Sequence, residues 1–297
     1  MNGKPRVDIV GPGAVGSLLA FFLQEQKIAF RLIGHQGVYQ KEIRVVPFGG
    51  SEEISLKPAN ASIYQSDIAV FAVKAYQLKD AMEGYSSVCS DNGVKFVTLS
   101  NGHFEKEIEG FIRNRIVSFG VVTYGVTRKA NVSPKVYQVR SSKGAMSWPS
   151  SESTSSSEIL IDKRLSHKKV GPSSQATALR VRKWTFNCVL NTLCAGESLR
   201  TNGMALNNKP RLKVLLSEAY ILAERLFQVP LPSLQKLFAE LVELIEATKD
   251  NQNSMYADRV AGRPTENPYL AGKAWHFPDA PEVFPELLSL TKQFYKR

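Results

Sequence analysis

The chain has 297 residues, of which 43% are hydrophobic and 22% are charged, so it has the composition of a globular protein and a length typical of about two domains. Its formal net charge of +11 favours anionic partners such as nucleic acid, a membrane surface or phosphorylated small molecules. The basic stretch from Lys163 to Lys183 has no interleaved aromatic residue, and we find no helix-turn-helix or RNA-binding signature, so a nucleic-acid binder is the least favoured class.

Local patterns disfavour three other classes of protein. The longest apolar runs, such as "AVGSLLAFFL", are about half as long as a membrane span. The N-terminal "MNGKPRVDIVG" shows neither the apolar region nor the cleavage site of a signal peptide. The 3 cysteines form no C-x-x-C pair and have no metal-ligand spacing. We therefore expect a cytoplasmic protein without a metal and without membrane association.

The first half of the chain alternates strand-like and helix-like segments. A helix is expected over Ala14–Gln26, after a glycine turn. The expected strands are Arg6–Val10, Ala29–Ile33, Ile68–Val73, Val94–Ser100 and Ile116–Val122. This alternation is typical of a parallel α/β sheet, and it predicts a Rossmann-type domain over residues 1–171.

The composition changes at the serine-rich segment Ser141–Glu158, where we expect turns, a loop or an exposed hairpin. Short strands are expected on either side of it, at Val136–Val139 and Ile159–Ile161, and Gly171-Pro172 is the expected domain boundary. Beyond this boundary, long helical patterns cover Ala176–Cys194, Lys213–Phe227 and Leu234–Thr248. They predict an all-α domain over residues 172–297.

A glycine-rich loop lies between the first strand and the first helix. In "VDIVGPGAVGS" the three glycines form a G-x-G-x-x-G frame, which in this context predicts a dinucleotide site. The first glycine permits the tight turn, the second allows a pyrophosphate to approach the backbone, and the third allows close helix–strand packing. The expected cofactor contacts are Gly11, Pro12, Gly13, Ala14, Val15 and Gly16.

The end of the second expected strand carries the residue that recognises the ribose in such folds. It is acidic in NAD-binding proteins, whereas a basic neighbour accommodates the extra phosphate of NADP. Here "RLIGHQG" offers His35 or Gln36 and no carboxylate. We therefore expect NADP. Either His35 contacts its phosphate, with Lys41 or Arg44 assisting, or His35 is an ordinary loop residue.

The segment "KWTFNCVLN" carries Lys183, Asn187 and Asn191 at spacings of i, i+4 and i+8, which align on one side of a helix. Burying an ammonium group and two amides is costly unless polar groups lie opposite them. Arg180 and Arg182 lie beside the lysine in the sequence, and a partly dry environment near them predicts easier proton release from Lys183. We expect this polar side to face a cleft between the domains.

Several separated segments resemble the 2-dehydropantoate 2-reductase (ketopantoate reductase) family. These segments are "GPGAVGS", "VKAYQ", "LSNGH", "GVVTYGVTR", "KWTFNCVLN" and "NSMYADRVAGRPTE", so the resemblance runs from Gly11 to about Gly272. It implies NADPH-dependent reduction of ketopantoate to (R)-pantoate, a step towards pantothenate and coenzyme A.

The resemblance also implies roles for individual residues. Lys183 is implied as the general acid, and Glu266 as the acid that engages the substrate oxygen and balances the lysine. Asn187, Asn191 and Ser254 are implied as substrate-binding residues, with Ser254 at the carboxylate. Lys74 and Asn101 are implied as cofactor-binding residues on the α/β domain. A cationic proton donor suits this chemistry, because hydride addition to a ketone leaves negative charge on oxygen.

Each of these residues also has a purely structural interpretation. Lys183 can be a solvated helix lysine, Asn101 a turn residue before glycine, Ser254 a helix cap, Lys74 a strand end and Glu266 half of a salt bridge. Their joint occurrence in the order of the family favours the functional interpretation.

The chain also departs from the family after "GVTR". Gln138 lies near an expected histidine, and Arg140 replaces an expected glycine. A reductase of another 2-keto acid and a non-catalytic dinucleotide sensor therefore remain alternatives, and a homodimer remains open.

Overall fold

The computed structural model describes residues 5–59, 66–89, 93–140, 144, 146–147 and 173–294. The chain forms two compact units. The first comprises Met1–Ser100 and Glu105–Thr177, and the second comprises Asn101–Phe104 and Ala178–Arg297. The first unit contains mixed α/β structure and the second is largely helical, so the predicted fold class is confirmed. The boundary predicted at Gly171-Pro172 lies outside the described residues, as does the strand predicted at Ile159–Ile161.

Among the described residues, six strands form the main sheet of the first unit, in the order β3-β2-β1-β6-β7-β8. Neighbouring strands are parallel except for β2 and β3, which form an antiparallel hairpin. Val10 pairs with Ile33 and with Phe71, so the carboxyl ends of the three central strands lie side by side. In parallel sheets this edge binds ligands. The strands are β1 (Val7–Val10), β2 (Phe30–Gly34), β3 (Gly37–Val38), β6 (Ile68–Phe71), β7 (Lys95–Thr98) and β8 (Val117–Phe119).

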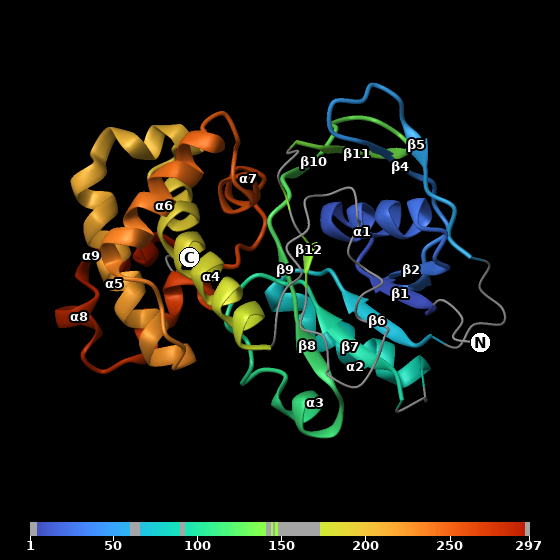
Figure 1. Cartoon of the computed structure of the whole chain (residues 1–297), viewed down its shortest axis with the longest axis horizontal. Coiled ribbons are helices and arrows are strands. Elements are labelled where there is room, and N and C mark those ends of the chain that lie inside the picture. The colour runs from blue at the N-terminus through green and yellow to red at the C-terminus, as the bar shows by residue number, and fades with distance from the viewer. Residues whose placement is uncertain are drawn as a thin grey trace. The chain divides into compact units, whose positions relative to one another are not determined.

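Helices lie on both faces of this sheet (Figure 1). Helix α1 (Ala14–Glu25) packs between the main sheet and a second sheet, and its buried side chains include Leu18, Leu19 and Leu23. Helix α2 (Leu78–Val88) follows the 3₁₀ turn η2 (Ala75–Gln77) and packs against β6. Helix α3 (Glu109–Asn114) precedes β8.

A buried polar cluster joins β1, β2 and α2. The Asp8 carboxylate is completely buried and accepts hydrogen bonds from Arg31 at 2.7 and 2.6 Å and from the Tyr85 hydroxyl at 2.7 Å. Burial, and then the charge of Asp8, raises the pKa of Tyr85 far above its ordinary value. Because a buried charge is costly without partners, the three side chains depend on one another.

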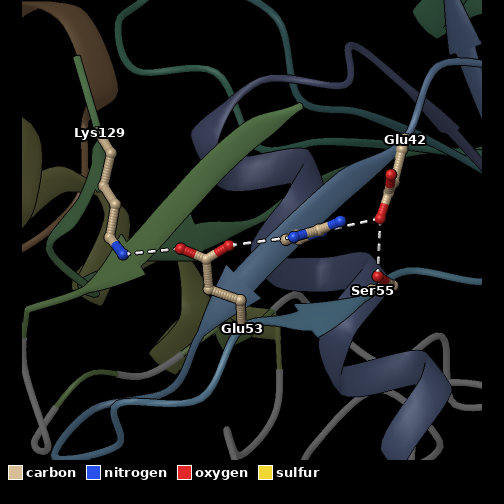
Figure 2. Close-up of polar contacts among 5 residues, drawn as sticks. Glu42, Glu53, Ser55 and Lys129 are labelled. Carbon is tan, nitrogen blue, oxygen red and sulfur yellow. Dashed lines mark hydrogen bonds and ion pairs between the residues drawn. The ribbon is translucent and has the colours of Figure 1, made fainter. Parts of the chain in front are cut away.

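The second sheet has the strand order β10-β11-β4-β5. Only one of its strands, at Val136–Val139, is predicted from the sequence, because the others are short. Hydrogen bonds join Glu42, Arg44, Glu53, Ser55 and Lys129 in a polar network on this sheet (Figure 2). The strands are β10 (Val126–Arg128), β11 (Lys135–Val139), β4 (Ile43–Val46) and β5 (Ile54–Ser55).

The segment Ile116–Val122, which the sequence predicts as one strand, contains two strands that pair separately. The chain leaves the main sheet after β8, and β9 (Val121–Val122) then pairs with β12 (Met146–Ser147). The amide of Gly120, between the two strands, donates to the carbonyl of Thr98 at 2.8 Å. The prediction was wrong because apolar content alone carries no information about the pairing partner.

The second unit is built from helices around an apolar core. In α6, Leu237, Leu241 and Ile245 recur every four residues and are completely buried, which is the pattern of an amphipathic helix. Of the helices in the described part of the chain, none is long and apolar enough to cross a membrane. The helices are α4 (Ser173–Gly196), α5 (Lys209–Phe227), α6 (Leu234–Ala247), α7 (Ser254–Val260), α8 (Ala280–Val283) and α9 (Pro285–Thr291), and the 3₁₀ turns are η4 (Asn202–Asn208), η5 (Asn267–Tyr269), η6 (Ala271–His276) and η7 (Lys292–Phe294).

Candidate active site

Lys183 lies in the middle of α4 and is half-buried. Its Nζ donates a hydrogen bond of 2.7 Å to Oδ1 of Asn101. On the other side of the same amide, Nδ2 of Asn101 donates to Oε2 of Glu266 at 3.4 Å. The asparagine therefore links an ammonium donor to a carboxylate acceptor, each through the atom of suitable polarity.

Glu266, the acidic member of the trio Lys183, Asn101 and Glu266, is almost completely buried. Glu266 is 5% exposed and directly precedes η5. Its negative charge is opposite to that of Lys183, and the two side chains are connected through hydrogen bonds to Asn101, which lies between them. In a salt bridge the ammonium group of Lys183 would contact the carboxylate of Glu266 directly. Here the ammonium group donates to the amide oxygen of Asn101 instead.

The electrostatic state of Lys183 suits proton transfer. Burial lowers its pKa to about 8, and the negative charge of Glu266 opposes part of this shift. The direction is the one expected from the sequence, but the neighbouring arginines are not the cause. Arg182 pairs with Glu240 at 3.2 Å, and Arg180 donates to the carbonyl of Gly102 at 3.0 Å. A lysine of this pKa can release a proton near neutral pH.

The two other polar residues of α4 follow Lys183 along the helix. Asn191 is 9% exposed and Asn187 is half-buried. Ser254 is exposed at the first position of α7, and Asn253 caps that helix by accepting from the amide of Tyr256 at 2.9 Å. The capping role considered for Ser254 therefore belongs to its neighbour. Among the described residues, none hydrogen-bonds to the side chain of Asn187, Asn191 or Ser254, so these groups can bind a ligand.

The glycine loop of the first unit joins β1 to α1. Gly11 has a φ of +101°, which other residues rarely adopt, and a Cβ there would lie 2.7 Å from Val73. A Cβ on Gly16 would lie 2.1 Å from the backbone oxygen of Gly11. Both positions therefore require glycine, for the turn and for helix–strand packing respectively.

The middle glycine of the loop meets a different environment. A Cβ on Gly13 would find no atom of the described residues within 4 Å, so glycine leaves open space there. Gly13 is the N-cap of α1, and the first turn of that helix holds no acidic residue. The following Ala14 and Val15 are half-buried, and the carbonyl of Pro12 accepts from the Tyr137 hydroxyl at 3.4 Å. Open space at a helix N-terminus with free amides fits the pyrophosphate of a dinucleotide.

Lys74 lies in the loop that follows the neighbouring strand β6. Since β1 and β6 are parallel, this loop and the glycine loop leave the same edge of the sheet. The carbonyl of Val73 accepts from Oγ of Ser100 at 2.7 Å, which ties the loop to the end of β7. Lys74 itself is half-buried at the N-cap of η2.

The position expected to recognise the ribose lies in the turn of the β2–β3 hairpin. His35 and Gln36 connect Gly34 to Gly37, and both are exposed. The expected assistance from Arg44 is not supported, because this guanidinium donates to Glu42 at 2.8 Å and contacts Glu53 at 3.5 Å (Figure 2). Lys41 is exposed at the start of the segment that leads to β4.

The structure thus assembles Lys183, Asn101 and Glu266 from parts of the chain that are far apart in sequence. Asn101 belongs to the second unit, whereas the family resemblance implies a cofactor-binding residue on the α/β domain. The pattern Asn-Gly predicts a turn and carries no signal for a lysine partner. Gln138 lies in β11, and Arg140 follows this strand and donates to Oγ1 of Thr127 at 3.0 Å.

Two protein-family models match the chain. "Ketopantoate reductase PanE/ApbA" matches residues 7–151, and "Ketopantoate reductase PanE/ApbA C terminal" matches residues 175–277. A curated relative, 2-dehydropantoate 2-reductase of Bacillus subtilis, is 23% identical over 276 residues, which is 90% of this chain and 88% of the relative.

Solved structures show the same fold at low sequence identity. Dimeric ketopantoate reductase from Staphylococcus aureus superposes with a TM-score of 0.72 at 20% identity, over 97% of this chain and 99% of the other. D-mandelate dehydrogenase in ternary complex with NADH and anilino(oxo)acetate gives a TM-score of 0.75 at 17% identity, over 98% of this chain and all of the other (100%).

Proposed function

The chain belongs to the ketopantoate reductase family of oxidoreductases, and from this premise we propose that it is an NADPH-dependent reductase of 2-dehydropantoate that forms (R)-pantoate. The observation that carries the proposal is the Lys183–Asn101–Glu266 arrangement, with a lysine whose pKa is about 8. Lys183 and Glu266 are the proposed catalytic residues.

The lysine supplies what a ketone needs when it accepts a hydride. NADPH, when bound, provides the hydride to C2 of the keto acid. Negative charge then develops on the C2 oxygen, and the ammonium of Lys183 stabilises this charge and donates a proton to the oxygen. The products are a hydroxyl group and a neutral lysine, which regains its proton from solvent. Glu266 keeps the lysine protonated near neutral pH by its charge.

The remaining polar groups of the second unit are proposed to orient the substrate. Ser254 holds the substrate carboxylate through its hydroxyl, and Asn187 and Asn191 hydrogen-bond its polar groups. The support is that these side chains have no hydrogen-bond partner among the described residues, although Asn191 is largely buried.

The cofactor is proposed to bind at the glycine loop. The amides of Gly13, Ala14 and Val15 would hold the pyrophosphate, with Gly11, Pro12 and Gly16 shaping the loop, Lys74 beside it, and Asn101 near the nicotinamide. His35 in the β2–β3 turn would contact the 2′-phosphate. The preference for NADPH over NADH rests on the absence of a carboxylate in this turn.

The test is the oxidation of NADPH at 340 nm with a panel of keto acids. Ketopantoate, 2-ketoisovalerate and an aryl 2-keto acid such as phenylglyoxylate are each run with NADPH and with NADH. The proposal predicts the highest kcat/KM for ketopantoate with NADPH. A preference for phenylglyoxylate would favour the alternative that the protein reduces another 2-keto acid. The fold that it shares with D-mandelate dehydrogenase motivates this alternative.

A dinucleotide sensor without catalysis is the second alternative. It predicts tight NADPH binding, no turnover with any keto acid, and tolerance of Lys183→Ala. We also propose a cytoplasmic homodimer with its domain boundary near residue 171, and sedimentation velocity at several protein concentrations tests the dimer.

A further inference from the structure

We propose that Arg180 is a positioning residue, which holds the Asn101–Phe104 segment on the helical unit and thereby places the Asn101 amide on Lys183. Asn101 needs such support because its side chain must serve two partners at once. Its oxygen accepts from Lys183 at 2.7 Å, and its nitrogen donates to Glu266 at 3.4 Å.

The backbone of the Asn101–Phe104 segment is anchored first at His103. Its amide donates to the carbonyl of Tyr269 at 2.8 Å, and the indole Nε1 of Trp184 donates to the same carbonyl at 3.0 Å. One oxygen thus joins the segment, α4 and η5. Tyr269 is three residues after Glu266, so this anchor lies close in sequence to the carboxylate of the trio.

Arg180 provides the second anchor, and it acts through both backbone and rings. Its guanidinium donates to the carbonyl of Gly102 at 3.0 Å. The same group lies over the ring of Phe104 at 5.5 Å and over the ring of Phe227 at 5.4 Å. Phe104 is 1% exposed, so the end of the segment is fixed in the core. A planar cation that stacks and donates together restrains the segment more than a lysine would.

The position of Arg180 on α4 explains how it controls Asn101. Arg180 and Lys183 are three residues apart, so both lie on the side of the helix that meets the segment. Arg180 holds residues 102 and 104, and Lys183 meets residue 101. Gly102 has a φ of +125°, so the chain changes direction between the anchored carbonyl and Asn101. Without the hydrogen bond from Arg180, Gly102 would be free to move, and the Asn101 side chain would shift away from Lys183.

Arg182 offers a matched control on the same helix. Its guanidinium pairs with Glu240 at 3.2 Å and its side chain is 39% exposed. Arg182→Met therefore removes the same number of atoms and the same charge from α4 without touching the Asn101–Phe104 segment.

The test measures the reactivity of Lys183 directly, without turnover. The rate of acetylation of its ε-amine by trace acetic anhydride is followed against pH by mass spectrometry in Arg180→Met, Asn101→Ala and the double variant. We expect Arg180→Met to shift the Lys183 profile in the same direction and to a similar extent as Asn101→Ala. In the Asn101→Ala background, Arg180→Met should change the rate by less than about twofold.

Turnover provides the second readout, and this part rests on the proposed function. We expect Arg180→Met to lower kcat by about 10- to 100-fold, because a displacement of about 1 Å of a reacting group has an effect of this size. Arg180→Lys should not restore kcat, and Arg182→Met should behave as wild type.

The inference would be overturned if Arg180→Met left the Lys183 profile unchanged, or if its effect simply added to that of Asn101→Ala. Should Arg180→Met fail to fold, Arg180→Lys takes its place in the same labelling cycle. If wild type shows no turnover while the labelling cycle shows coupling, the proposed function fails and the positioning role stands.

Discussion

Replacement of Glu266 by glutamine tests whether the charge of Glu266 raises the pKa of Lys183. The variant keeps the shape of the side chain and removes the charge that raises the pKa of Lys183 against the effect of burial. Hydrogen bonds of 2.7 and 3.4 Å with one amide between them place the two charges no more than about 8 Å apart. At an effective dielectric constant of about 20, this separation corresponds to roughly 2 kcal/mol, or more than one pKa unit.

We therefore expect the pKa of Lys183 in Glu266→Gln to fall from about 8 towards 7. Since the protonated lysine is the proposed proton donor, the rate of keto acid reduction should decline with rising pH around 8 in wild type and about one unit lower in the variant. The assay is the pH profile of kcat for NADPH oxidation, accompanied by acetylation of Lys183 without substrate. Glu240→Gln, which removes a carboxylate that pairs with Arg182 on the same helix, is the control.

An unchanged profile in Glu266→Gln, or a shift to higher pH, would refute this reasoning. Either result would mean that the charge of Glu266 does not raise the pKa of Lys183. A similar shift in Glu240→Gln would mean that the effect is general to charges near α4.

The remaining predictions concern stability and the cofactor loop. Lys183→Met should stabilise the protein at pH 7 by about 1–3 kcal/mol in urea unfolding, because the burial of the charged amine costs energy. Since the folded-state pKa of about 8 lies below the ordinary lysine pKa of 10.5, wild type should regain stability as the pH rises between these values, and the advantage of the variant should fade. Gly16→Ala should impair folding, because its Cβ would lie 2.1 Å from a backbone oxygen, whereas Gly13→Ala should fold normally and bind NADPH about tenfold or more weakly in a fluorescence titration. Tyr85→Phe removes a 2.7 Å hydrogen bond to buried Asp8 and should cost about 1–3 kcal/mol in the same unfolding assay, while an unchanged midpoint would contradict this.

The parts of the fold that were predictable from the sequence are those with strong local signals. The glycine frame, the strand before it and the helix after it lie next to one another in the chain, and the long helices of the second unit repeat their apolar residues regularly. Local spacing also identified the polar side of α4. These features depend on the period of the secondary structure and on turn geometry, both of which a sequence displays directly.

The second sheet was not predictable in this way. Its strands β4, β5 and β10 have two to four residues, and β4 pairs with β11, so that Ile43 lies opposite Lys135. Pairing across such a separation in sequence leaves no local pattern. The division of Ile116–Val122 between two sheets has the same origin.

The partner of the lysine was missed for a similar reason. Asn101 precedes a glycine and resembles a turn residue, while its contact with Lys183 depends on where the Asn101–Phe104 segment packs. The arginines beside Lys183 were expected to lower its pKa, but their guanidinium groups are engaged with Glu240 and with the carbonyl of Gly102. Neighbours in sequence can thus point to different sides of a helix and to different partners.

The central claim is that Lys183 donates the proton in a reduction driven by NADPH. A single-turnover experiment tests it most directly, with NADPH-loaded enzyme mixed with ketopantoate at pH 7 in wild type and Lys183→Ala. The account predicts rapid oxidation of NADPH in wild type and a rate about 10²- to 10⁴-fold lower in a variant that still folds and binds NADPH. Oxidation at the wild-type rate in Lys183→Ala would contradict it.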